Sequence, residues 1–322
     1  MDPLSDVLRA VRLDGAFFYL VEAVHPWSVH SEPAVELTPR VLPGAEHLIT
    51  YHIVTEGSCW GGVIGEPQVL LEAGDAILFP HGDAHFMSSA EGGRVDPSLH
   101  TSRPARYLDT VRVGAVGGRG EGMGRRTEFV CGFLGWDSHP FNPLLRSLPR
   151  MLHVPRAAGE WLSLFPRQAV VESRRERAGG ATVLTRMAEL MFVEVLRRHM
   201  ESVGASRRGW LAALRDPVVG AALAQLHEHP AREWTLADLS RGANSSRTVL
   251  SERFAELVGL TPMQYLAQWR LQLAAEQLAS TAEKVATIGE KVGYESEAAF
   301  SRAFKRATGE SPAAWRRKRG TG

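Results

Sequence analysis

The sequence predicts two domains of different class: a small antiparallel β-barrel followed by an all-α domain. Three observations support this. Short apolar runs separated by glycine and proline turns extend from about Phe17 to Leu134, a pattern typical of strands. Apolar residues at helical spacing follow after Pro143. The last third of the chain then contains one pattern of helix caps and stops twice, fifty residues apart, within a total length of 322 residues.

The composition is that of an ordinary globular protein, with 44% hydrophobic and 23% charged residues. No apolar run approaches the ~20 residues of a membrane span. Asp2 and Asp6 near the start argue against a secretory leader. Cys59 and Cys131 are the only cysteines, so we expect a cytoplasmic protein without a disulfide framework and without a membrane partner.

Charge is divided unequally along the chain. From Arg207 onward, 17 Lys and Arg accompany 12 Asp and Glu, whereas the preceding residues carry 20 against 24. A basic C-terminal part attached to an acidic N-terminal part suggests a nucleic-acid module joined to a module with another task.

The clearest strands of the first half are Leu48–Val54, Val69–Leu71 and Ala76–Phe79, each bounded by turn residues. A further strand over Glu128–Leu134 would place Cys131 on the same face as two phenylalanines, because alternate residues of a strand share a face. We therefore expect Cys131 to be buried.

Two helical segments, Trp161–Arg175 and Ala181–Ser202, follow the predicted barrel. The apolar residues of the second fall on one broad face, which can pack on the first domain or pair with a second copy of the chain. We expect a homodimer through this region. The polar segment Gly204–Gly209 is the expected linker. The predicted domains are the barrel over 1–142, a helical connector over 143–206 and the helical domain over 207–322.

The C-terminal domain carries a series of helix-capping signals. Asp216, Thr235, Ser246, Thr261 and Ser296 stand where N-caps are expected. Glycines at the end of two of the helices supply stop signals. The predicted helices include Leu236–Arg241, Arg247–Val258, Thr261 to about Ala279, Thr287–Val292 and Glu297–Thr308.

An offset of fifty residues places one part of this domain on another. It matches Ser246 with Ser296, Leu250 with Phe300, Phe254 with Phe304, Gly259 with Gly309, and Pro262 with Pro312. Upstream of the caps the offset drops by one, which indicates a one-residue difference between two turns. Each copy is a helix, a turn and a capped helix, the order of a helix-turn-helix unit.

The predicted helix from Thr261 to Ala279 connects the two copies. Its 19 residues span on the order of 28 Å. That length can hold two reading helices near the ~34 Å that separates successive major grooves. We therefore expect one chain to contact two successive major grooves of double-stranded DNA.

Two segments resemble the DNA-binding domain of the AraC/XylS family of transcription regulators: WTLADLSRGANSSRTVLSERFAELVGLTPMQYLAQWRLQLAAEQL and IGEKVGYESEAAFSRAFKRATGESP. The resemblance covers a third of the chain. It implies a sequence-specific regulator, which is either an activator that can also contact RNA polymerase or a repressor. Asn244-Ser245 replaces the family's more usual Gly-Met before Ser246, and we expect this to alter the angle of the first reading helix.

The resemblance and helical geometry together predict the side chains that face DNA. They are Ser246, Arg247, Thr248, Ser251 and Glu252 in the first copy, and Ser296, Glu297, Ala298, Ser301, Arg302 and Lys305 in the second. Arg302 is the expected base reader because arginine bonds guanine at two atoms; a phosphate contact is the alternative. The two cap serines and Lys305 suit phosphates.

The segment GDAILFPHGDAH places Gly74, Pro80, Gly82 and His85 at the spacing of the second signature of cupin barrels. Gly57 stands where the first signature would end. This half of the chain resembles the cupin-type sensor attached to some AraC/XylS regulators, and the resemblance implies a barrel that encloses a ligand.

His52, His85 and Cys131 are the candidate residues of this effector site. The first cupin signature lacks its usual histidine ligands, and two ligands rarely make a firm metal site, although His47 is a further candidate. We expect a small-molecule effector, no metal or other cofactor and no enzymatic activity. The alternative is a cupin-type metalloenzyme, a dioxygenase or isomerase, fused to a DNA-binding domain. Core histidines without a ligand and a redox role for Cys131 are further interpretations.

Overall fold

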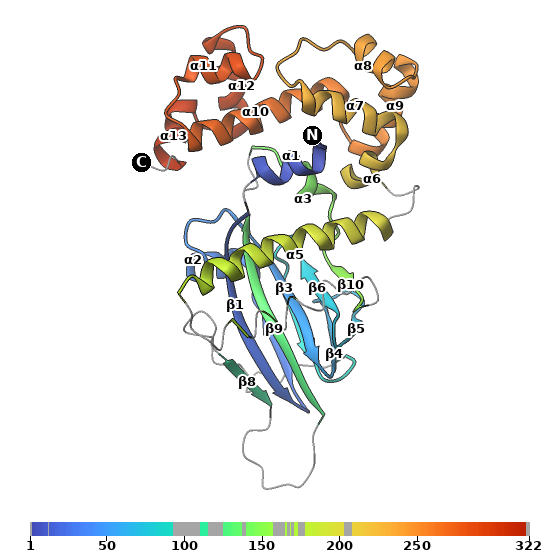
Figure 1. Ribbon diagram of the computed structural model, residues 1–322, viewed down its shortest axis with the longest axis vertical. Helices are drawn as coiled ribbons and strands as arrows, with labels where there is room; N and C mark the ends of the chain where they lie inside the picture. The colour runs from blue at the N-terminus through green and yellow to red at the C-terminus, as the bar shows by residue number, and fades with distance from the viewer. Residues whose placement is uncertain are drawn as a thin grey trace. The chain divides into compact units, whose positions relative to one another are not determined.

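The computed structural model describes residues 2–11, 13–92, 110–114, 125–136, 140–156, 165, 168, 171–172, 178–202 and 208–319. Its chain divides into two packing units (Figure 1). The helical unit consists of the described residues of Met1–Arg12, Asp137–Ser147 and Val203–Gly322. The β unit consists of those of Leu13–Trp136 and Leu148–Ser202.

Two segments that are distant in the sequence from the C-terminal helices, Met1–Arg12 and Asp137–Ser147, therefore belong to the same unit as those helices. Most of the helix predicted over Trp161–Arg175 and of the linker predicted over Gly204–Gly209 lies outside the described residues.

The β unit contains two sheets built from ten described strands. These are β1 (Leu13–Val24), β2 (Ser28–Ser31), β3 (His47–Glu56), β4 (Ser58–Val63), β5 (Val69–Glu72), β6 (Ala76–Phe79), β7 (His85–Ser88), β8 (Thr110–Gly114), β9 (Arg126–Trp136) and β10 (Leu152–Val154). The strand orders are β10-β6-β3-β9-β1-β8 and β2-β7-β4-β5. The four strands predicted from the sequence lie within β3, β5, β6 and β9.

The sheets are antiparallel with one exception among the described pairs. At one edge β8 pairs with β1 in parallel, with Leu20 opposite Thr110. The sequence predicted a small antiparallel barrel. The sheet-rich N-terminal fold is confirmed, and the pairing of β8 with β1 is the exception to its antiparallel order among the described strands.

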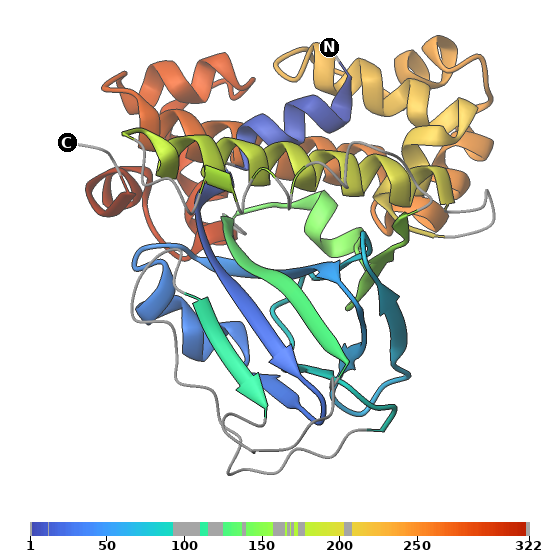
Figure 2. The ribbon, with the colours of Figure 1, turned by 60° about the horizontal axis from the view of Figure 1, so that its bottom comes forward.

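Apolar side chains from both sheets form one core. Val54 and Phe129 from the six-stranded sheet pack in the same cluster as Leu71 and Met87 from the four-stranded sheet. Helix α2 (Ala34–Val41) packs on β3, and α5 (Gly180–Ser202) contacts β1 and β10. Figure 2 shows α5 running across the end of the six-stranded sheet.

The helical unit contains ten described helices. They are α1 (Pro3–Ala10), α3 (Pro143–Ser147), α6 (Trp210–Arg215), α7 (Pro217–Glu228), α8 (Leu236–Gly242), α9 (Arg247–Val258), α10 (Pro262–Ser280), α11 (Val285–Lys291), α12 (Glu297–Thr308) and α13 (Pro312–Arg319). The helices predicted for this domain are confirmed, with α11 beginning at Val285 rather than Thr287. No described helix could span a membrane.

Helix α10 supplies core residues to both helix-turn-helix units. Toward its start, the Tyr265 ring meets Phe254 of α9 edge to face, with centroids 5.8 Å apart. Toward its end, Leu271 and Leu278 pack in one cluster with Phe300 of α12. The pairs α8/α9 and α11/α12 consequently lie at opposite ends of α10 (Figure 1).

The two early segments of the helical unit pack on the middle of α10. The Gln272 side chain is 3% exposed. Its Nε2 donates to the carbonyl of Ala10 at 2.9 Å, and its Oε1 accepts from the N–H of Phe141 at 3.0 Å. Asp6 of α1 lies 3.6 Å from His227 of α7. One buried amide thus joins the end of α1 and the segment before α3 to the helix that connects the two helix-turn-helix units.

Candidate nucleic-acid interface and buried polar cluster

Helix α9 presents most of its predicted contact residues to solvent. Leu250 and Phe254 are fully buried and fix the helix on its neighbours. Off this buried stripe, Ser246, Arg247, Thr248 and Glu252 are exposed and Ser251 is half-buried. The Ser246 side chain accepts from the N–H of Val249 at 3.2 Å, so the helix begins where the sequence predicts.

Helix α12 repeats this arrangement. Phe300 and Phe304 are fully buried. The other predicted residues are accessible: Ser296, Glu297, Ala298, Arg302 and Lys305 are exposed and Ser301 is half-buried. Within the described part of the chain, neither Arg302 nor Lys305 forms an ion pair, so both cations are available to an anionic partner.

Sequence reasoning did not single out the exposed apolar residue Val249 of α9. Val249 is 46% exposed and lies next to Thr248 on the accessible side of the helix. An apolar side chain there can contact the methyl group of thymine. Its position away from the Leu250 and Phe254 stripe is the signal that would have identified it.

The two turns differ by one residue, as the repeat predicts. Asn244 (φ 49°) and Gly293 (φ 92°) occupy the same left-handed position. The following residues, Ser245 and Tyr294, each donate to a carbonyl five residues earlier, at 2.9 Å. The extra residue of the second turn is Glu295, which precedes the cap Ser296. Asn244 therefore retains the backbone conformation that glycine has in the second turn, since asparagine tolerates it better than most residues.

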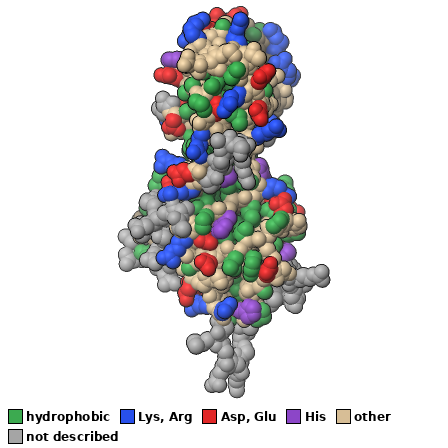
Figure 3. Space-filling view, turned by 90° about the vertical axis from the view of Figure 1, so that its right-hand side faces the viewer, with side chains coloured by type: hydrophobic (Ala, Val, Ile, Leu, Met, Phe, Trp, Pro, Cys, Tyr) green, Lys and Arg blue, Asp and Glu red, His purple; other side chains and the backbone are tan. Residues whose placement is uncertain are grey.

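Basic side chains are numerous on the helical unit. On the face drawn in Figure 3, Lys and Arg side chains are spread over this unit, with Asp and Glu side chains among them. Helix α12 has Lys305 and Arg306 in its last turn, whereas α9 has no basic residue in its last turn. The second reading helix is therefore the more cationic of the two.

The β unit brings together the three residues predicted for the effector site. His52 of β3 lies with its Nδ1 2.8 Å from Cys131 Sγ of β9 and its Nε2 2.8 Å from His85 Nε2 of β7. His52, His85 and Cys131 are 4%, 1% and 2% exposed. The cluster thus links the two sheets inside the β unit.

Hydrogen bonding assigns the tautomers. His85 Nδ1 lies 2.8 Å from the carbonyl of Asp83, which can only accept, so His85 carries its proton on Nδ1. His85 Nε2 then accepts from His52 Nε2–H. The remaining ring nitrogen of His52 accepts from the Cys131 thiol. Every polar atom of the three side chains is satisfied in the uncharged state.

Burial keeps this cluster neutral. It lowers the pKa of His85 to about 4 and that of His52 well below the ordinary histidine value, with the neighbouring His85 as a second cause for His52. Burial also raises the pKa of the Cys131 thiol, and that of Cys59 to about 12. A thiolate is the reactive form of cysteine, so neither buried thiol is activated.

Within the described ranges, no three His, Cys, Asp or Glu side chains are grouped as metal ligands. His47, considered from the sequence as a further ligand, instead has its Nε2 2.6 Å from the carbonyl of Pro80.

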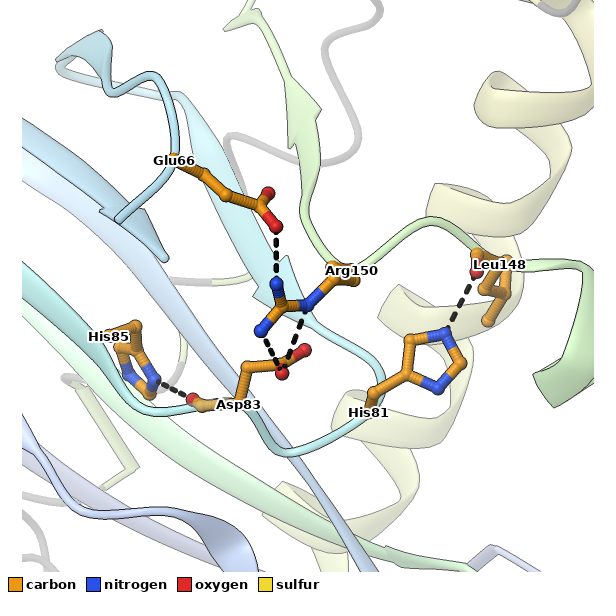
Figure 4. A network of polar contacts seen from close by, with 6 residues as sticks. All are labelled: Glu66, His81, Asp83, His85, Leu148 and Arg150. Carbon is orange, nitrogen blue, oxygen red and sulfur yellow. Dashed lines mark hydrogen bonds and ion pairs between the residues drawn. The ribbon is translucent and has the colours of Figure 1, made fainter. Parts of the chain in front are cut away.

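An ion-pair network fixes the loop that orients His85 (Figure 4). Arg150 donates to the Asp83 carboxylate from Nε at 3.1 Å and from Nη2 at 2.5 Å, and it also bonds Glu66. The carbonyl of the same Asp83 accepts from His85. Asp83 therefore positions the buried His85 through its backbone carbonyl, while Arg150 holds the Asp83 side chain near the surface.

Two aromatic residues near this cluster were not predicted. The Tyr19 hydroxyl donates to Cys131 Sγ. Trp27 stacks on Phe129 with centroids 5.4 Å apart, and Phe129 meets the His52 ring edge to face at 6.0 Å. Trp27 Nε1 is buried and has no acceptor among the described residues. Both residues come from strands or turns remote in sequence, so no local spacing indicates them.

Two capped, exposed second helices at the ends of one connecting helix are the arrangement of a DNA-binding protein, and this one carries an additional β unit. The chain belongs to the AraC-like transcription regulators. A family described as cupin matches residues 2–201, and one described as a helix-turn-helix domain matches residues 239–318.

Relatives match along the whole chain. A putative AraC-like transcription regulator of Streptomyces lividans is 33% identical over 327 residues, covering 98% of each chain. The HTH-type transcriptional regulator AlkR of Acinetobacter baylyi is 28% identical, covering 99% of this chain and 100% of that protein. The DNA-binding domain of AdpA, solved in complex with a target DNA, is 30% identical, covering 32% of this chain and 91% of that chain, with a TM-score of 0.30.

The protein is accordingly a transcription regulator and not an enzyme, and the metalloenzyme alternative is not supported.

Proposed function

We propose that this regulator places α9 and α12 in two successive major grooves on one side of duplex DNA. The observation that supports the proposal is the matched exposure of the two helices on either side of α10. Ser246 and Ser296 cap them in the same way, and both helices keep a buried apolar stripe opposite an accessible polar face. The 19 residues of α10 span on the order of 28 Å, close to the ~34 Å between grooves.

Within this arrangement, side chains of the two accessible faces have distinct roles. Thr248, Ser251 and Glu252 of α9, and Glu297, Ala298, Ser301 and Arg302 of α12, face base edges. Ser246, Arg247, Ser296 and Lys305 lie near the helix starts or among cations and bind phosphates. RNA polymerase is the further macromolecular partner we propose, in keeping with an activator that acts in the cytoplasm.

Selection from a randomised duplex library with the full chain tests the DNA proposal. We expect an operator with two boxes about 10–11 base pairs apart from centre to centre, both protected on one face in a hydroxyl-radical footprint. Because α10 is continuous, inserting five base pairs between the boxes should reduce affinity to that of a single-box duplex. A single protected box, or full tolerance of the insertion, would contradict the proposal.

We propose further that the β unit binds an uncharged, mainly apolar effector with one hydrogen-bonding group. Three features support this chemistry: the cluster of His52, His85 and Cys131 is neutral, aromatic rings surround it, and Trp27 Nε1 lies buried without an acceptor. An effector oxygen near the cluster would accept from the indole N–H, since buried donors gain free energy when paired.

A thermal-shift screen of the full chain against neutral and charged small metabolites tests this proposal. We expect stabilising compounds among the neutral ones. Their affinity should fall about tenfold or more in Cys131→Ala and His52→Gln, a loss of at least about 1.4 kcal/mol. Cys59→Ala is the matched control, because Cys59 is equally buried but lies outside the histidine chain. Equal loss in both cysteine variants, or hits that are only charged, would overturn this assignment.

We propose that a second copy of the chain pairs with this one through α5. Val183 and Leu190 are 44% and 56% exposed, and half-buried Met187 lies between them on the same helical face. In sedimentation equilibrium, Leu190→Glu should shift a dimer to monomer. Thr182→Glu, exposed about a quarter of a turn away, should leave the dimer intact. A wild-type chain that stays monomeric at high concentration would exclude this interface.

A further inference from the structure

Arg270 lies at the middle of α10, between the residues that pack on the first helix-turn-helix unit and those that pack on the second. Its side chain is half-buried and, within the described residues, its hydrogen bonds go to backbone carbonyls rather than to a carboxylate. Burial lowers the pKa of its guanidinium. A cation in this position is held by oriented peptide dipoles.

Two of the three carbonyls come from the first helix-turn-helix unit's side and one comes from the second unit. Arg270 Nε donates to Pro230 at 2.7 Å, and Nη2 donates to Arg232 at 2.9 Å; both acceptors lie in the loop before α8. Nη1 donates to Gly293 at 3.1 Å, in the turn between α11 and α12. One planar guanidinium therefore joins the entry to the first unit with the turn of the second.

Gly293 allows the two units to approach at this point. A Cβ at this position would lie 2.8 Å from the carbonyl oxygen of Ala231 and 2.8 Å from Arg270 Cζ. The backbone of the first unit's loop and the guanidinium thus both occupy the space that a side chain would need. The loop is itself ordered, since the Arg232 guanidinium stacks over Trp234 at 4.2 Å.

We propose that Arg270 is a positioning residue that fixes the relative orientation of α9 and α12, and thereby sets the distance between DNA boxes that the regulator accepts. Lysine keeps the charge at this position, but its ammonium lacks the planar fork that reaches three carbonyls at once. Arg270→Lys should therefore release the second unit from the first while leaving each unit folded around its own aromatic core.

A distance measurement between spin labels tests the proposal without DNA. Labels go on Glu256→Cys in α9 and Arg306→Cys in α12, both exposed, whereas the native Cys59 and Cys131 are buried. We expect one narrow distance distribution in the parent chain and a distribution at least about twice as wide with Arg270→Lys, since guanidinium contacts are lost. Arg241→Lys is the control: Arg241 is exposed and pairs with Asp238 of its own helix.

A glycine pair tests the same contact from the opposite side. Gly293→Ala and Gly309→Ala both place a side chain at positive φ, 92° and 78°, and both incur backbone strain. Only the first also displaces the loop and Arg270, because a Cβ at Gly309 meets nothing within 4 Å. Broadening in Gly293→Ala alone supports the proposal, and equal broadening in both overturns it.

The relative affinities for DNA duplexes with different box spacing supply a second readout, which a general loss of protein stability would not change. The duplexes are the selected two-box operator, the same operator with one base pair added between the boxes, and a single-box duplex. The parent chain should lose about tenfold in affinity on the insertion, and Arg270→Lys less than about threefold, with single-box binding unchanged within about twofold. An unaltered label distribution, or equal loss on all three duplexes, would show that Arg270 does not set the spacing.

Discussion

Arg302 and Arg306 lie on the same accessible side of α12 and carry the same charge, yet we expect different roles for them. Arg302 lies in the second turn of the helix, where side chains reach base edges, whereas Arg306 lies in the last turn. Neither forms an ion pair within the described residues. The two arginines therefore offer a direct comparison of base and phosphate recognition.

Arg302→Ala should weaken specific binding by about 1–3 kcal/mol and relax the sequence requirement at one base pair. Arg306→Ala should weaken binding to all sequences alike and lower the salt dependence by about one unit of slope. Anisotropy titrations against single-base operator variants at several salt concentrations measure both effects. An Arg302→Ala protein with the parent affinity and footprint would refute the base-reading role.

The buried histidines predict how stability depends on pH. In the unfolded chain, histidine has a pKa of ~6.5. In the folded β unit, burial lowers the pKa of His85 to about 4 and also lowers that of His52. Above about pH 6.5, the neutral histidines therefore contribute fully to the free energy of unfolding. As the pH decreases toward 4, this free energy falls by about 1.4 kcal/mol per pH unit for each histidine, because the unfolded chain binds protons that the folded chain does not.

Calorimetric unfolding of the full chain between pH 7.5 and 5 checks this dependence. The transition of the β unit should move to lower temperature as pH falls, and His85→Gln should reduce the slope because one titrating group is gone. A slope unaffected by His85→Gln would show that this histidine is not held neutral.

At the scale of helices and strands, the sequence was informative wherever a boundary depends on local contacts. Helix α9 begins at a serine that caps its own third N–H and ends at Gly259 in the left-handed conformation, so a few residues determine each end. The parallel pairing of β8 with β1 depends on residues ninety apart, and no local pattern encodes it. Helix α1 was missed although Asp2-Pro3 is the same signal as Asp216-Pro217.

The turn between α8 and α9 provides a prediction at this scale. Asn244 occupies the left-handed region at φ 49°. Asn244→Ala should destabilise the helical unit by about 1–2 kcal/mol, because a Cβ without a local hydrogen-bonding group is disfavoured there. Asn244→Gly should be near neutral or slightly stabilising. Denaturant unfolding measures both, and equal stability of the two variants would contradict the backbone argument.

The candidate sites show the same division between local and long-range information. Strand alternation predicted that Cys131 is buried, and the structure brings it together with His52 and His85. Tyr19 and Trp27 join them only because the sheet order brings β1 and the segment after it beside β9. Their contribution depends on contacts between residues about a hundred positions apart, which a single sequence does not reveal.

Over the whole molecule, stretches that are far apart in the sequence pack together in one unit. The segments that precede β1 and follow β9 both belong to the helical unit, where Gln272 bonds one residue from each. In the β unit, Leu13 at the start of β1 lies opposite Trp136 at the end of β9.

Gln272→Leu should destabilise the helical unit by about 1–3 kcal/mol, because the carbonyl of Ala10 and the N–H of Phe141 would stay buried without a partner. Gln268→Leu is a suitable control, since Gln268 lies one turn earlier on the same helix and its side chain is only half-buried. Hydrogen exchange at Phe141 and the unfolding free energy are the measurements. Protection of that amide in the Gln272→Leu variant would count against the role of Gln272.

The interleaved packing also governs how reading modules can be exchanged between related regulators. A chimera cut once, just before α6, would import α10 with its glutamine but leave the donor's α1 and the segment before α3 behind. The Gln272 side chain of the imported α10 would then face residues of the recipient protein or water in place of Ala10 and Phe141. A faithful graft has to move three separate stretches of the gene, so these regulators are expected to diverge by substitution more readily than by simple recombination of halves.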